Sequence, residues 1–141
     1  MNYAIVLRLL SYILLTEGAL LLLPAVASLC YGEWFVMGVF LFTAALSALA
    51  GAPFHRVKAK SQIFYMREGF VTTALCWLLI SVVGAVPFVL TGCIPNPVDA
   101  LFETVSGFTT TGASILPAVA DLPKGILFWR SFTHWVGGMG V

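Results

Sequence analysis

Charged residues are scarce in this sequence. Only 9% of its 141 residues are Asp, Glu, Lys or Arg, whereas an ordinary soluble domain carries about 25%. The net charge of +1 excludes a strongly basic nucleic-acid-binding protein, so no nucleic acid is expected as a partner. Three cysteines are too few for a small secreted scaffold built on disulfides.

Apolar residues are correspondingly abundant. They make up 60% of the chain, and the mean hydropathy is +1.01. Such a composition excludes a disordered chain, because disordered segments are poor in apolar residues. The sequence therefore predicts a small all-α membrane protein with the lipid bilayer as its surroundings.

Three stretches are long enough to cross a bilayer. A spanning helix needs about 20 mostly apolar residues, since the hydrocarbon core is roughly 30 Å thick and each helical residue rises 1.5 Å. These stretches are Leu9–Tyr31, Trp34–Phe54 and Gly69–Gly92. A fourth stretch, Ile126–Val141, carries Arg130 and His134 and is too short to cross. We expect the chain to end inside this last helix and to be part of a longer protein.

The start of the chain has two interpretations. The apolar run before Ala25–Ala27 resembles a signal peptide with a small-residue cleavage site. Glu17 lies in the middle of that run, which argues for a retained helix instead. Within a retained span, Glu17 is either a functional group or, as we expect, hydrogen-bonded to a neighbouring helix.

The basic residues predict the orientation, because positively charged short loops stay in the cytoplasm. Four of the seven lie in the loop at 55–67, namely Arg56, Lys58, Lys60 and Arg67. We therefore expect the N-terminus and this loop to be cytoplasmic. The segment at 93–125 is then outside.

The outside segment begins with a predicted short helix. Asn96 is a suitable N-cap, Pro97 suits the first helical position, and Asp99 in the first turn suits the helix dipole. The periodicity predicts a helix over Pro97–Gly107, about half the length needed to cross the membrane.

The sequence after this helix indicates an ion-binding loop. Thr109, Thr110 and Thr111 are β-branched and precede Gly112, so they should end the helix and favour extended backbone. Irregular backbone at membrane depth lies only where protein buries it or where it lines a watery cavity. A re-entrant pore loop could bind a dehydrated cation through the carbonyls of Thr109–Gly112. The alternative is a surface turn after a helix that lies on the membrane.

Three motifs connect the sequence to a known family. Asp99–Ser114 (DALFETVSGFTTTGAS) closely resembles the first pore loop of the Trk/Ktr/HKT superfamily of potassium transporters. Trp129–Gly140 (WRSFTHWVGGMG) resembles the helix that follows this loop, and Arg67–Phe70 resembles the start of the first repeat. Two extra spans before that repeat match the TrkH/TrkG branch.

The resemblance implies a fold and a function. It implies an all-α polytopic membrane protein with transmembrane helices, one re-entrant pore helix and a filter loop. Residues 1–62 would be an additional N-terminal hairpin with the basic loop. Residues 63–141 would be the first membrane–pore loop–membrane repeat, truncated in its second helix. The parent protein would take up K⁺ across the cytoplasmic membrane, with Thr109, Thr110, Thr111 and Gly112 binding the ion.

The resemblance also implies partners. They are the three remaining repeats, a second copy of the protein, and a cytoplasmic nucleotide-binding subunit of the TrkA type.

A glycine at the position of Gly112 accompanies K⁺ selectivity in the family. The alternatives are a transporter of Na⁺ or mixed cations, and a membrane scaffold that does not conduct.

The remaining polar residues yield secondary expectations. Asp99 and Glu103 are candidates for the outer mouth, where they would concentrate cations. Arg130 and His134 share one helix face, and Arg130 is expected to pair with an acid such as Glu103 or Asp121. No zinc spacing, nucleotide loop or catalytic triad appears, so neither an enzyme nor a metal other than K⁺ is expected.

Overall fold

A computed structural model describes residues 2–58 and 63–140. Within those ranges the chain is helical, without a strand, and consists of α1 (Tyr3–Leu20), α2 (Leu22–Cys30), α3 (Trp34–His55), α4 (Met66–Leu90), α5 (Pro97–Phe108), the 3₁₀ turn η1 (Val119–Asp121) and α6 (Lys124–Gly140). Three helical segments are long and apolar enough to span a membrane: Tyr3–Cys30, Trp34–His55 and Met66–Leu90. The predicted all-α class is confirmed.

The first span is longer than predicted and is divided in two. It begins at Tyr3 rather than at Leu9, so that Arg8 lies inside the helix. The division at Leu21 precedes Pro24, which has no N–H to donate and crowds the carbonyl four residues earlier. The two parts nevertheless form one segment of 28 residues.

The ends of the later helices also differ slightly from the predictions. The third span starts at Met66 rather than Gly69, because the Glu68 carboxylate accepts from the Tyr65 N–H at 3.2 Å and so caps the start of the helix. The fourth helix starts at Lys124 rather than Ile126. The predicted end at Val141 lies outside the described residues, as does Lys60 of the basic loop.

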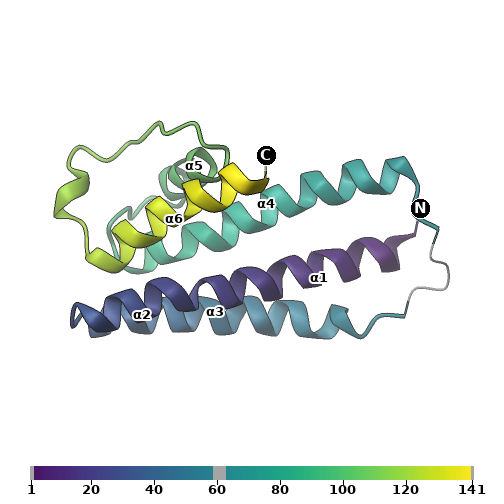
Figure 1. The fold of residues 1–141 in the computed structure, drawn as a ribbon, viewed down its shortest axis with the longest axis horizontal. Coiled ribbons are helices and arrows are strands. Elements are labelled where there is room, and N and C mark those ends of the chain that lie inside the picture. The colour runs from purple at the N-terminus through teal and green to yellow at the C-terminus, as the bar shows by residue number, and fades with distance from the viewer. Residues whose placement is uncertain (1, 59–62, 141) are drawn as a thin grey trace.

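Two layers make up the bundle (Figure 1). The α1–α2 segment packs along α3, while α4 lies on its other side and carries α5 and α6 on the half of its length farthest from the N-terminus. Small residues allow the close contact between α1 and α3. The Ser47 hydroxyl donates to the Leu14 carbonyl at 2.6 Å, and a Cβ on Gly51 would lie 3.1 Å from the Ser11 carbonyl oxygen.

Several of the largest fully buried side chains lie where α4, α5 and α6 meet the first hairpin. Trp129 of α6 contacts Phe40 of α3 and Phe108 of α5 edge-on, at ring-centroid distances of 6.3 Å. Its indole N–H donates to the Gly84 carbonyl of α4 at 3.0 Å. One tryptophan therefore joins the short helix α5 to the two spans behind it.

Candidate functional site

The short helix α5 forms as its sequence predicts. The Asn96 side chain accepts a hydrogen bond from the Val98 N–H at 3.1 Å, and Pro97 occupies the first turn. The helix ends at Phe108, one residue beyond the predicted Gly107. This confirms a helix of 12 residues that is too short to span a bilayer.

In α5 the polar face is buried and much of the apolar face is exposed, the reverse of an amphipathic helix in a soluble protein. The polar residues Glu103, Thr104 and Ser106 are buried against the rest of the chain. The apolar side chains of Val98 and Phe102 remain 71% and 47% exposed. The polar face of α5 therefore serves internal hydrogen bonds.

The chain after α5 turns back on the end of the helix. The Thr110 N–H donates to the Gly107 carbonyl and the Thr111 N–H to the Ser106 carbonyl, both at 3.0 Å. Within the described part of the chain, no hydrogen bond is made to the carbonyls of Thr110, Thr111 or Gly112. Three consecutive carbonyl groups are thus available for a ligand.

The local backbone differs from the extended conformation that we expected. Thr109 has φ −81° and ψ 0° and continues the helical turn. Thr110 has φ 58°, a left-handed conformation that is rare for a β-branched residue. The N–H bonds to the end of α5 hold the threonines in a turn, which outweighs their preference for extended backbone. Gly112, with φ 77°, adopts a conformation that glycine reaches without steric penalty.

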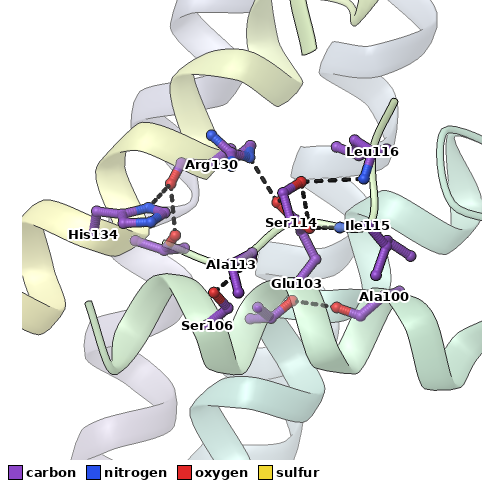
Figure 2. A network of polar contacts seen from close by, with 11 residues as sticks. Ala100, Glu103, Ser106, Ala113, Ser114, Ile115, Leu116, Arg130 and His134 are labelled. Atoms are coloured by element: carbon purple, nitrogen blue, oxygen red, sulfur yellow. Dashed lines mark hydrogen bonds and ion pairs between the residues drawn. The ribbon is translucent and has the colours of Figure 1, made fainter. Parts of the chain in front are cut away.

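Two side chains of α5 hold the segment that leaves the turn (Figure 2). The Ser106 hydroxyl donates to the Ala113 carbonyl at 2.6 Å. Glu103 accepts from the Ser114 hydroxyl at 3.0 and 3.1 Å and from the Ile115 N–H at 3.3 Å. The loop is therefore fixed to α5 on both sides of Gly112.

Arg130 of α6 completes this network. Its Nε lies 2.6 Å from Oε1 of Glu103, and the side chains are 20% and 1% exposed. His134, one turn further along α6, contacts the Arg130 carbonyl through Nδ1 at 2.8 Å. The expected pairing of Arg130 with an acid is confirmed for Glu103.

The burial of Glu103 corrects its expected place at an open outer mouth. Its carboxylate is engaged by Ser114, Ile115 and Arg130 and is closed to solvent. Asp99 is half-buried in the first turn of α5. The place of Asp99 at an outer mouth stays a prediction.

Glycines allow α6 to approach the end of α5. A Cβ on Gly137 would collide with the Phe108 carbonyl, and one on Gly107 would collide with the Thr133 side chain. The neighbouring Gly138 and Gly140 have no such contact. Gly137 therefore allows α6 to pack directly on the last residue of α5.

Sequence analysis missed the residue whose side chain caps the start of α6. Glu33, in the link between α2 and α3, accepts from the Lys124 N–H at 2.7 Å and from the Gly125 N–H at 3.0 Å. It was visible in the sequence only as the lone charge of that link. Since the contact joins residues 91 and 92 positions apart, no local pattern could have indicated it.

Comparisons with known proteins agree with this geometry. A family model described as TrkH, cation transport protein, matches residues 36–141. The chain belongs to the TrkH family. The described residues contain no group of His, Cys, Asp and Glu able to hold a metal ion.

Individual relatives cover the whole chain. The potassium uptake protein TrkH of Halomonas elongata is 34% identical over all of this chain and 30% of its own length. An uncharacterised cation transporter of Methanocaldococcus jannaschii is 36% identical over 96% of this chain and 28% of its own length. The crystal structure of the potassium transporter TrkH from Vibrio parahaemolyticus superposes with a TM-score of 0.91, at 31% identity, over 100% of this chain and 30% of that one. The chain thus spans about 30% of the length of its TrkH relatives.

Proposed function

We propose that this chain is the N-terminal part of a K⁺ uptake transporter and that the carbonyls of Thr109–Gly112 form one wall of its ion filter. The observation that carries the proposal is the exposed turn after α5, in which the carbonyls of Thr110, Thr111 and Gly112 accept no hydrogen bond within the described residues. Carbonyl oxygens held in fixed positions can replace the water shell of a cation. The C-terminal end of α5 contributes a partial negative charge next to them.

The same proposal assigns the parts of the chain. Residues 1–62 form the additional hairpin and residues 63–141 the first repeat, with the N-terminus and the 55–67 loop in the cytoplasm and 93–125 outside. A single loop surrounds only about a quarter of an ion, because filters are rings of such carbonyls. Three further repeats therefore complete the ring. The working protein is a dimer in the cytoplasmic membrane and binds a TrkA-type subunit.

The ion selectivity has one specific alternative. Several relatives are named potassium uptake proteins, whereas the archaeal relative is named only a cation transporter. The presence of free carbonyls in the loop does not by itself show whether K⁺, Na⁺ or both ions are transported. Transport of Na⁺ or mixed cations is therefore the second candidate, and a scaffold that does not conduct is the third.

A chimera tests the proposal. This chain would replace the matching segment of Escherichia coli TrkH, to which it is 32% identical over its full length, in cells that lack their own K⁺ uptake. We expect growth at limiting K⁺ and K⁺ influx well above Na⁺ influx. Equal influx of the two ions would support the mixed-cation alternative. Unmodified TrkH, expressed in the same cells in a parallel experiment, is the positive control. If it restores K⁺ influx and the chimera reaches the membrane without doing so, the result would support a scaffold that does not conduct.

A further inference from the structure

At the end of the bundle farthest from the N-terminus, the link between α2 and α3 lies beside the start of α6 (Figure 1). The N-terminal hairpin that this link closes has two acidic residues, Glu17 and Glu33. Neither carboxyl oxygen of Glu17 makes a hydrogen bond within the described residues, so the expected bond from Glu17 to a neighbouring helix is not formed. Glu33 instead accepts from the N–H groups of Lys124 at 2.7 Å and Gly125 at 3.0 Å. Of the two acids, Glu33 is the one that joins the hairpin to α6.

The hairpin itself holds Glu33 in place. The Glu33 N–H donates to the Ser28 carbonyl at 2.9 Å, and the Trp34 N–H donates to the Gly32 carbonyl at 3.1 Å. Gly32 has φ 75°, a left-handed conformation that glycine adopts without steric penalty. These contacts all lie within residues 28–34, so the backbone that carries the carboxylate is positioned without help from α6.

The start of α6 is also closely packed against the hairpin. A Cβ on Gly125 would collide with the Ser28 hydroxyl and would lie 3.1 Å from Cγ1 of Val36. The Ser28 hydroxyl is itself held, since it donates to the Pro24 carbonyl at 2.9 Å. The next side chain of α6, that of Ile126, is fully buried. The first turn of α6 therefore fits the hairpin in one position along the helix axis.

The segment that leads into α6 does not fix this position by itself. Residues 113–123 contain one regular element, the three-residue turn η1. In contrast, α6 is a continuous helix of 17 residues, so a shift of its start moves the whole helix. Arg130 is six residues, roughly 9 Å, beyond Lys124 and pairs with Glu103, which accepts from Ser114 and Ile115 of the loop. The start of α6 is thus connected to the loop through one helix and one ion pair.

We propose that Glu33 is a positioning residue of the ion path: it fixes the start of α6 and, through the ion pair between α6 and α5, the loop at Thr109–Gly112. This inference rests on the proposed function, in which that loop lines the filter. It gives the N-terminal hairpin a task in transport, namely to hold α6 against the loop. The first N–H groups of a helix have no partner within the helix and favour a negative charge, so a carboxylate suits this contact.

Amide hydrogen exchange, measured on the chimera in lipid nanodiscs, tests the positioning without relying on transport. Glu33→Ala removes both acceptor oxygens from the start of α6. We expect exchange to become at least tenfold faster at Lys124 and Gly125. It should also become several-fold faster at Ile115, whose N–H bonds to Glu103. Unchanged exchange at either place would overturn the proposal.

Two further variants control this measurement. Ser47→Ala breaks a buried hydrogen bond to the Leu14 carbonyl inside the hairpin, away from α6, and should leave the exchange at Gly125 and Ile115 unchanged. Glu33→Gln keeps one acceptor oxygen, so its exchange rates should lie between those of Glu33→Ala and the unaltered chimera. It also replaces Glu33→Ala in the test if the alanine variant does not fold. Equal acceleration by Ser47→Ala would contradict a specific role of Glu33.

The ratio of K⁺ to Na⁺ influx separates this proposal from the proposed function. In a conducting chimera, Glu33→Ala should lower the ratio several-fold, whereas Ser47→Ala should leave it unchanged. Equal ratios in Glu33→Ala and the unaltered chimera would overturn the positioning role and leave the filter assignment in place. An unaltered chimera that does not conduct would contradict the proposed function, and the exchange rates then decide alone whether Glu33 positions the loop.

Discussion

Glu103 and Arg130, 27 positions apart in the sequence, form a buried ion pair of 2.6 Å between Oε1 and Nε. Because Glu103 also accepts from Ser114 and Ile115, this pair connects α5, the loop after it and α6. The position of the loop then depends on the buried carboxylate of Glu103.

Removing the charge of Glu103 should therefore destabilise the chain and loosen the loop. Glu103→Gln keeps the shape of the side chain but leaves the Arg130 charge without its partner. We expect a loss of roughly 3 kcal/mol in unfolding free energy, at the low end for a broken buried pair because Arg130 keeps some exposure. Thermal or denaturant unfolding in detergent micelles measures it.

Two further variants control this prediction. Asp121→Asn removes an exposed carboxylate from the same segment and should leave the stability unchanged. The double variant Glu103→Gln with Arg130→Met should recover part of the loss, since it removes the uncompensated charge. Equal stability of Glu103→Gln and the unaltered chain would contradict the assigned role.

Ser106→Ala should free the exit of the loop. It removes the bond from the Ser106 hydroxyl to the Ala113 carbonyl, and we expect a loss of about 1 kcal/mol and weaker K⁺ selectivity in the chimera. Ser81→Ala is the matched control, because the Ser81 hydroxyl bonds only to the Trp77 carbonyl of its own helix. If both variants keep the K⁺ preference of the unaltered chain, Ser106 does not position the loop.

Gly137→Ala should separate α6 from α5. The added methyl group would collide with the Phe108 carbonyl, and a rigid backbone atom cannot yield as a flexible side chain would. We expect destabilisation of about 1–3 kcal/mol and a lower uptake rate. Gly140→Ala has open space around it and should be neutral or slightly stabilising. Comparable unfolding midpoints for the two variants would rule out the close contact.

Local features were predictable from the sequence, whereas contacts between distant segments were not. The start of α5 could be predicted from Asn96 and Pro97, because a helix cap acts within one helical turn. Thr110 has a left-handed backbone, which is contrary to the local preference of threonine. The hydrogen bonds to Ser106 and Glu103 that hold its loop form only once the chain has folded. Likewise, the polar face of α5 is buried because the fold brings the Ser114 hydroxyl, the Arg130 guanidinium and the Ala113 carbonyl to it.

The central claim is that the carbonyls around Gly112 select the ion, and a pair of glycine substitutions tests it most directly. Gly112 and Gly92 have φ values of 77° and 76°, and nothing lies within 4 Å of a Cβ built on either. Serine at each position therefore causes a similar backbone strain of roughly 1–2 kcal/mol. The measurement is the ratio of K⁺ to Na⁺ influx in the chimera. The ratio should fall several-fold in Gly112→Ser and stay unchanged in Gly92→Ser; an unchanged ratio in Gly112→Ser would contradict the claim.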